Sequence, residues 1–220
     1  ASDRARTGIL EGNPIHKDML WAAENAGLKF IVNVVLNDAK EPIFAVAGDL
    51  KQAHKKGTDF ISSLCKASCE EGDIAISTNG GYPLDQNVYQ AAKGMTAAEA
   101  AVKKGGVVIM LAESIDGTGG EFFDRVIAGD QTVDEKMNAI LSRSAADTLP
   151  DQWQAQIILR VIQKATVIYV SSIPDETVKK MNMLPAHSLT EAIKLAKEII
   201  GKPDAKIVAI PNGTAVVVVK

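Results

Sequence analysis

The chain has 220 residues, a formal net charge of −3 and 46% hydrophobic residues. This is the composition of an ordinary globular protein with enough chain for a buried core, and its apolar runs are too short for a membrane-spanning helix. The slightly acidic balance and the dispersed lysines and arginines argue against a nucleic-acid duplex as partner, because such a partner selects a basic face.

The N-terminal part predicts a helix, a hairpin and a second helix. Asn13-Pro14 is a typical helix start and Gly27 a typical stop. The expected elements are a helix over residues 14–26, strands at 30–36 and 43–47, and a helix from 49 toward 70.

The two cysteines, Cys65 and Cys69, are expected on that second helix, four residues apart. A disulfide is geometrically awkward at this spacing, and a zinc site would lack further ligands. We therefore expect two reduced thiols, as is usual for a cytoplasmic protein.

After residue 70 the pattern alternates between strands and helices. Strands are expected at 73–77, 107–112, 167–170 and 207–210, and helices at 83–93, 121–127, 133–145, 151–163, from 175, and 189–200. The alternation predicts an α/β fold with a mostly parallel sheet and helices on both faces.

Loops that follow the carboxyl ends of parallel strands line the ligand crevice of such a fold. The candidate loops are residues 77–85, 112–120 and 171–174. In the first, Gly80-Gly81 allows close backbone approach, and we expect Asp85 to cap the helix that follows.

That helix carries Gln90 and Lys93, which lie on one face at a spacing of three residues. An ammonium beside an amide suits a small carboxylate with an adjacent hydroxyl. The alternative is a solvated pair on an outer face, and the spacing alone favours that alternative, because such pairs are common on helices.

The longer run of sequence around Gln90 and Lys93 favours the binding role over the solvated pair. Residues 79–94 read Asn-Gly-Gly-Tyr-Pro-Leu-Asp-Gln-Asn-Val-Tyr-Gln-Ala-Ala-Lys-Gly. This run resembles the C-terminal domain of the nickel-dependent lactate racemase family, and further similarity lies at residues 8–19, 30–36, 119–122 and Trp153. The resemblance covers nearly the whole chain and implies a two-domain α/β enzyme with its active site between the domains.

The resemblance implies an isomerase that racemises a 2-hydroxy acid such as lactate by hydride transfer to a nickel pincer nucleotide. It makes Gln90 and Lys93 substrate-binding residues, with Lys93 on the carboxylate, and Trp153 a wall of the substrate pocket. From the residues alone, the favoured interpretation of Trp153 is a half-buried packing residue near a helix start.

The resemblance also implies what this chain lacks. The lysine that tethers the cofactor, the nickel-binding histidine, the two acid/base histidines and a nucleotide-binding arginine belong to an N-terminal domain ahead of it. We therefore expect a C-terminal fragment that is inactive alone, binds no cofactor and uses none of its histidines, His16, His54 and His187, in catalysis.

The same resemblance gives an expected domain arrangement. Residues 1–66 would complete the cofactor-binding N-terminal domain, 67–187 would grip the substrate, and 188–220 would be a linking helix and strand that return to the N-terminal domain. The missing domain is then an expected partner, and the surface it leaves exposed favours self-association into a homo-oligomer.

Two other functions remain open. The loop from Asp116 to Gly120 follows a strand and is rich in glycine, which suits a nucleotide-binding α/β module with an oxidoreductase role. It lacks the lysine and hydroxyl of a P-loop, and a tight turn also explains it. The second is a non-catalytic carboxylate-binding domain. Nicotinamide binding would favour the former, and tight 2-hydroxy acid binding without a cofactor the latter.

Overall fold

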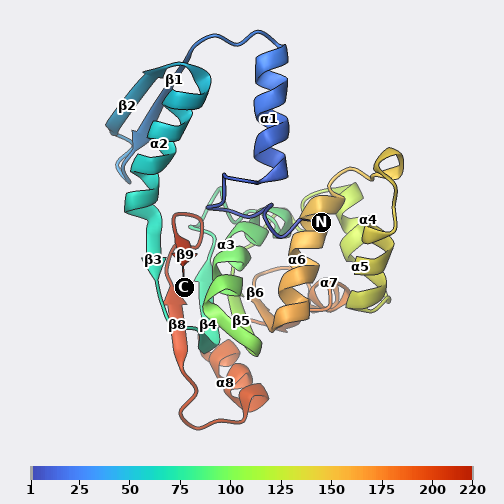
Figure 1. The fold of residues 1–220 in the computed structure, drawn as a ribbon. Coiled ribbons are helices and arrows are strands. Elements are labelled where there is room, and N and C mark those ends of the chain that lie inside the picture. The colour runs from blue at the N-terminus through green and yellow to red at the C-terminus, as the bar shows by residue number, and fades with distance from the viewer. Residues whose placement is uncertain (1, 220) are drawn as a thin grey trace. The chain divides into compact units, whose positions relative to one another are not determined.

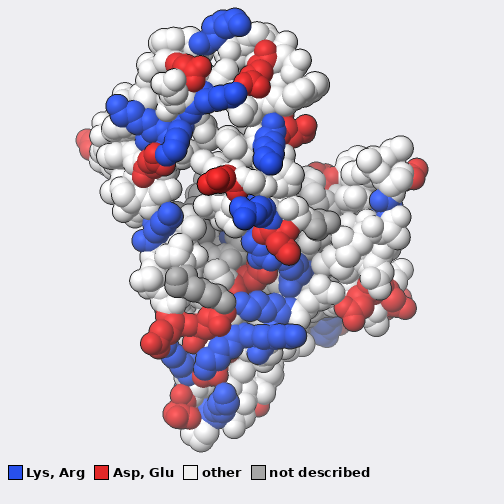
Figure 2. Space-filling model, in the orientation of Figure 1, with Lys and Arg blue, Asp and Glu red and all other residues white. Residues whose placement is uncertain are grey.

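The computed structural model describes residues 2–219 and divides the chain into two compact units, Ala1–Ala67 and Ser68–Lys220 (Figure 1). None of the helices in this range is long and apolar enough to cross a bilayer. On the face drawn in Figure 2, acidic and basic side chains are interspersed rather than sorted into one basic surface.

The first unit has the helix, hairpin and helix that the sequence predicts. Its elements are α1 (Pro14–Asn25), β1 (Ile31–Leu36), β2 (Pro42–Gly48) and α2 (Leu50–Cys65), with β1 and β2 antiparallel. The Asn13 side chain accepts a hydrogen bond from the Ile15 amide at the start of α1, and Asp49 does the same for the start of α2.

Helix α2 covers one face of the hairpin, where the rings of Phe44 and Phe60 stack at 4.2 Å. Because side chains alternate across a strand, the other face carries Val32 and Val34, which are 66% and 53% exposed. Within the described residues, the first unit by itself therefore presents an exposed apolar sheet face.

The expected extension of α2 toward residue 70 is wrong. The helix ends at Cys65, and Lys66 has extended backbone that begins a short strand, β3 (Lys66–Ser68). Pairing of β3 with the C-terminal strand Val217–Val219 overrides the local preference for helix. Cys69 is therefore not on the helix of Cys65, and both thiols are free.

The second unit is built on a five-stranded parallel sheet with strand order β7-β6-β5-β4-β8. Its strands are β4 (Gly72–Thr78), β5 (Val102–Leu111), β6 (Thr166–Val170), β7 (Leu184–Ala186) and β8 (Ile207–Ile210), followed by a short β9 (Val217–Val219). Its helices are α3 (Val88–Ala101), α4 (Glu121–Ile127), α5 (Val133–Leu141), α6 (Gln152–Lys164), α7 (Asp175–Lys180) and α8 (Leu189–Ile200), with a 3-10 turn at Ala145–Asp147.

Both faces of this sheet are covered, which confirms the predicted α/β class (Figure 1). Side chains that alternate along the central strands enter different cores. Val108 and Tyr169 pack in the core that contains residues of α3, α4, α5 and α6, whereas Ile109 and Ile168 pack against α8. This double burial explains why the strands are nearly continuous apolar runs.

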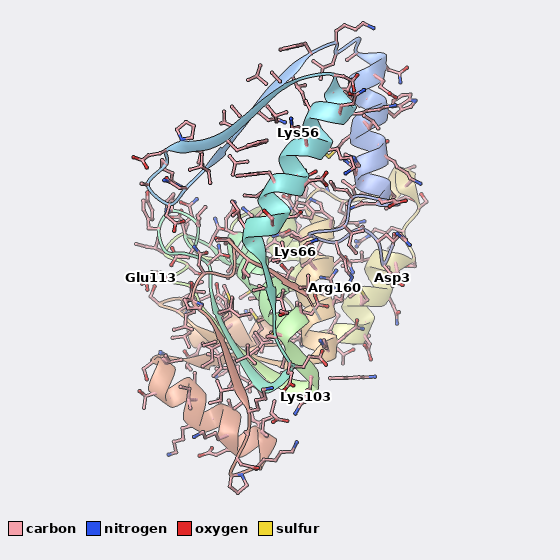
Figure 3. The ribbon with its side chains drawn as sticks, turned by 60° about the vertical axis from the view of Figure 1, so that its left-hand side comes forward. Asp3, Lys56, Lys66, Lys103, Glu113 and Arg160 are labelled. Carbon is pink, nitrogen blue, oxygen red and sulfur yellow. The ribbon has the colours of Figure 1, made fainter. Side chains whose placement is uncertain are left out.

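Helices α3 and α6 are also joined by a charged contact. The Arg160 guanidinium donates to both carboxylate oxygens of Glu99, at 2.9 and 2.7 Å, and Figure 3 labels Arg160. Both side chains are largely shielded from solvent. Such a bidentate pair fixes the two helices in orientation as well as distance.

A second charged cluster lies at the amino end of β4, opposite to the candidate loops. Asp73 accepts hydrogen bonds from the Lys206 amide and from the Lys103 and Lys202 ammonium groups at 3.0–3.1 Å. The Lys206 amide first, and then the two ammonium groups, hold the pKa of the Asp73 carboxyl well below its usual range. This carboxylate joins the starts of β4, β5 and β8 and is a structural group.

Candidate functional site

The three loops predicted to line a crevice do meet at the carboxyl edge of the sheet. Backbone hydrogen bonds join each loop to the next. They run from the Ser114 amide to the Asp85 carbonyl at 2.9 Å, from Asp116 to Gln86 at 2.8 Å, and from Ser172 to Glu113 at 3.2 Å. The rim of the candidate site is thus a bonded network of loops, and Figure 3 labels Glu113 within it.

Helix α3 starts later than predicted, at Val88 instead of residue 83, and its N-cap is Asn87. The Asn87 side chain accepts from the Gln90 amide at 2.9 Å. The prediction that Asp85 caps this helix is wrong, because Asp85 accepts from the Glu113 amide of the neighbouring loop instead. The segment before Val88 is held by that loop network and cannot join the helix.

The glycine-rich loop supplies the remaining caps of α3. The carbonyl oxygens of Gly117 and Thr118 accept from the Val88 and Tyr89 amides at 3.1 and 3.0 Å. At Gly119, which has φ +107, an added Cβ would lie 2.7 Å from the Cβ of Tyr89. Close packing on α3 therefore accounts for this loop.

Gln90 and Lys93 lie together as predicted, on the exposed side of α3. The Lys93 Nζ donates to the Gln90 Oε1 at 2.5 Å. Lys93 is exposed and Gln90 half-buried. Ala91 and Ala92, between them in the sequence, are fully buried in the core. Within residues 2–219 no carboxylate lies at ion-pair distance from Lys93, so its ammonium can take an anion without breaking a salt bridge.

Trp153 contacts the same turn of α3 through the ring of Tyr89. It is the second residue of α6 and is 57% exposed, and its ring meets that of Tyr89 edge-on at 5.9 Å. Tyr89 in turn meets Phe123 edge-on at 5.5 Å, and its hydroxyl donates to Asp151 at 3.4 Å. Burial first, and then the Asp151 carboxylate, raise the pKa of Tyr89.

The role of Tyr89 was missed from the sequence. It precedes Gln90 directly, and an aromatic residue beside two polar candidates was the available signal. Its contact with α6 depends on how two distant helices pack, which the local pattern does not contain.

The three histidines have partners of their own. His16 and His54 stack on each other at 5.1 Å in the first unit, and His187 lies 3.4 Å from an Asp175 carboxylate oxygen. Among the described residues no group of three or more His, Cys, Asp or Glu side chains is arranged to hold a metal ion.

Known proteins are similar to this chain in sequence and fold. A family model for the lactate racemase C-terminal domain matches residues 67–218. The lactate racemase of Thermoanaerobacterium thermosaccharolyticum is 49% identical over 215 residues, which is 97% of this chain and 50% of that protein. The lactate racemase of Lactiplantibacillus plantarum is 47% identical over 218 residues, which is 99% of this chain and 51% of that protein.

Solved structures agree. The lactate racemase apoprotein from Thermoanaerobacterium thermosaccharolyticum superposes with a TM-score of 0.96 at 48% identity, covering all of this chain and 52% of that one. A crystal structure of a protein from Thermotoga maritima has a TM-score of 0.60 at 19% identity, over 94% of this chain and 54% of that one, and shows the fold alone.

The chain spans about half the length of the curated relatives it matches. The resemblance to the lactate racemase family is confirmed by these matches, which extend over nearly the whole chain. The chain therefore belongs to the lactate racemase family and contains its C-terminal domain at residues 67–218.

Proposed function

We propose that the full-length protein interconverts the two hands of a 2-hydroxy acid, with lactate as the first substrate to test, and that this chain supplies the groups that bind the carboxylate. The observation that carries the proposal is the Gln90–Lys93 pair on α3, an exposed ammonium held against an amide oxygen. It lies in a domain of a family whose curated members are named lactate racemases.

The pair has the right chemistry for a 2-hydroxy acid. Lys93 has only donors, so it turns the Gln90 side chain with its oxygen toward the ammonium and leaves the amide NH₂ free to donate elsewhere. In this role Lys93 pairs with the substrate carboxylate and Gln90 donates to an adjacent oxygen. Trp153, fixed edge-on to Tyr89, presents an apolar ring as a wall beside them.

The proposed reaction needs a cofactor, because a C2 hydrogen beside an ionised carboxylate is a poor acid. The family resemblance implies a nickel pincer nucleotide, which would accept that hydrogen as a hydride while a base takes the hydroxyl proton. The described residues of this chain do not fit a nickel site, since they contain no suitable group of three donors. We therefore propose that cofactor and acid/base residues are supplied by the rest of the full-length protein.

The domain assignment also stays a proposal. Residues 1–66 would belong with the cofactor domain, and the exposed apolar face at Val32 and Val34 supports their being covered by another part of the full-length protein. Residues 67–187 would grip the substrate and 188–220 would link back, although α8 and β8 pack on the second unit's sheet. The two free cysteines support a reducing cytoplasm as its location.

The experiment compares the full-length, nickel-loaded protein with the 220-residue chain. We expect the full-length protein to convert D-lactate into a mixture of both hands, and the isolated chain to give no turnover and retain no nickel after gel filtration. Chiral chromatography and metal analysis measure the two results, and full-length protein produced without nickel is the control. Turnover or stoichiometric nickel in the isolated chain would overturn the proposed division of labour.

A further inference from the structure

The turn of α3 that carries Lys93 sits directly on the end of β4. At Gly94, an added Cβ would lie 2.6 Å from the Thr78 carbonyl oxygen and 2.7 Å from the Met110 methyl carbon. Only glycine allows this approach. The backbone next to Lys93 is therefore in contact with the sheet edge, and its height above the edge is fixed by backbone atoms.

Two fully buried side chains from the end of β4 bind this same residue. The Ser77 hydroxyl donates to the Gly94 carbonyl at 2.9 Å, and the Asn79 Oδ1 accepts from the Gly94 amide at 2.9 Å. In a regular α-helix the amide of Gly94 would donate to the carbonyl of Gln90. Asn79 therefore reaches into the helical turn that runs from Gln90 through Lys93.

The loop after β8 packs against the Gly94 backbone as well. The Gly213 amide donates to the Thr78 carbonyl at 3.1 Å. An added Cβ at Gly213 would lie 2.3 Å from the Ser77 hydroxyl and 2.8 Å from the Gly94 Cα. The Gly94 backbone is thus enclosed between the end of β4 and this loop, with no space into which it could shift.

Asn79 also holds the loop at the rim. Its amide nitrogen donates to the Leu84 carbonyl, so one buried side chain bonds both α3 and the segment between Gly81 and Asn87. A buried amide with both its oxygen and its nitrogen bonded permits one arrangement of its neighbours, and losing either bond leaves a buried polar group unsatisfied.

We infer that Asn79 is a positioning residue for the proposed substrate-binding pair. It sets where Lys93 and Gln90 lie relative to the rim loop between Gly81 and Asn87. The inference rests on the proposed role of Lys93 and deepens it. Asn79 is buried and does not touch substrate, so it acts through the α3 turn. A displacement of about 1 Å in a substrate-positioning group can cost about 100-fold in rate.

The test uses the full-length, nickel-loaded protein with Asn79→Ala and Asn79→Asp. For Asn79→Ala we expect a 10- to 100-fold lower kcat/KM for lactate, mainly through KM, and faster deuterium uptake at the Gly94 amide. Asn79→Asp keeps an oxygen for that amide, so its KM and its uptake should lie closer to the wild type. Thr132→Ala, which removes the N-cap of α5 away from this turn, controls for lost stability and should leave KM unchanged.

A double-mutant cycle separates positioning from mere stability. In the Lys93→Ala background, Asn79→Ala should lower kcat/KM by less than about threefold further, because the charged group it places is already gone and only the neutral Gln90 is left to misplace. A full, independent loss in that background, or a wild-type KM for Asn79→Ala, would overturn the inference while leaving the role of Lys93 intact. A wild-type KM for Lys93→Ala itself would instead overturn the proposed function.

Discussion

Replacing Lys93 by alanine in the full-length, nickel-loaded protein is expected to lower kcat/KM for lactate about 10- to 150-fold, chiefly by raising KM. The expected loss corresponds to the roughly 1.5–3 kcal/mol that a hydrogen bond to a charged group contributes. Lys93 is exposed, and among residues 2–219 its ammonium is bonded only to the neutral Gln90 side chain, so its charge is available to a carboxylate. Initial rates measured by chiral chromatography over a range of lactate concentrations give both constants.

Lys104 provides the matched control. It is an exposed lysine in the amino-terminal half of β5, far along the strand from the loops at its carboxyl end, and Lys104→Ala should leave both constants unchanged. Gln90→Ala should give a smaller loss than Lys93→Ala, because it removes a neutral donor. Equal effects of Lys93→Ala and Lys104→Ala would show that the site lies elsewhere.

Arg160→Ala is expected to destabilise the chain by on the order of 3 kcal/mol. The substitution removes the bidentate partner of the Glu99 carboxylate between α3 and α6, and breaking a buried pair by deleting one member is costly because the other charge stays buried. The free energy of unfolding, measured by urea titration at neutral pH, tests this directly.

Arg125→Ala is the comparison for that experiment. Arg125 pairs with Glu121 one turn away on α4, and both side chains are mostly exposed. Solvent screens such a pair, so the loss should be below about 0.5 kcal/mol. If the two substitutions cost the same, burial of the Glu99–Arg160 pair does not stabilise the packing of α3 on α6.

Elements whose signals are local could be predicted well. Helix α8 has the predicted bounds, Leu189–Ile200, because its apolar face is periodic and Gly201 ends it in the left-handed conformation at φ +64. Four of the five parallel strands were also predicted from their apolar runs, because burial on both sides leaves a signal in the sequence itself. The short edge strand β7 (Leu184–Ala186) has no such run and was not predicted.

Elements whose ends depend on distant contacts were placed less well. The start of α3 was predicted five residues early, because Pro83 and Asp85 are good helix-start residues by local rules. The chain instead uses Asn87 with carbonyls from Gly117 and Thr118, and no local pattern contains that partnership.

The candidate site likewise has features that follow from local spacing and features that depend on distant contacts. Gln90 and Lys93 are three residues apart on one helix, so their pairing follows from spacing. The contact of Trp153 with Tyr89 and the bonds from Asn79 to Gly94 join elements that meet only in the folded sheet. Asn79 did have a usable signal, since a polar residue directly after a buried strand stands at the edge where ligands bind.

The most direct test of the account is to incubate D-lactate that carries deuterium at C2 with the full-length, nickel-loaded protein in ordinary water, and to separate the two hands of the product by chiral chromatography with mass detection. We predict that L-lactate accumulates toward an equal mixture and keeps its deuterium, because the hydrogen leaves and returns as a hydride. No L-lactate from a protein verified to contain nickel would contradict the proposed function. L-lactate that has lost its deuterium to water would contradict hydride transfer.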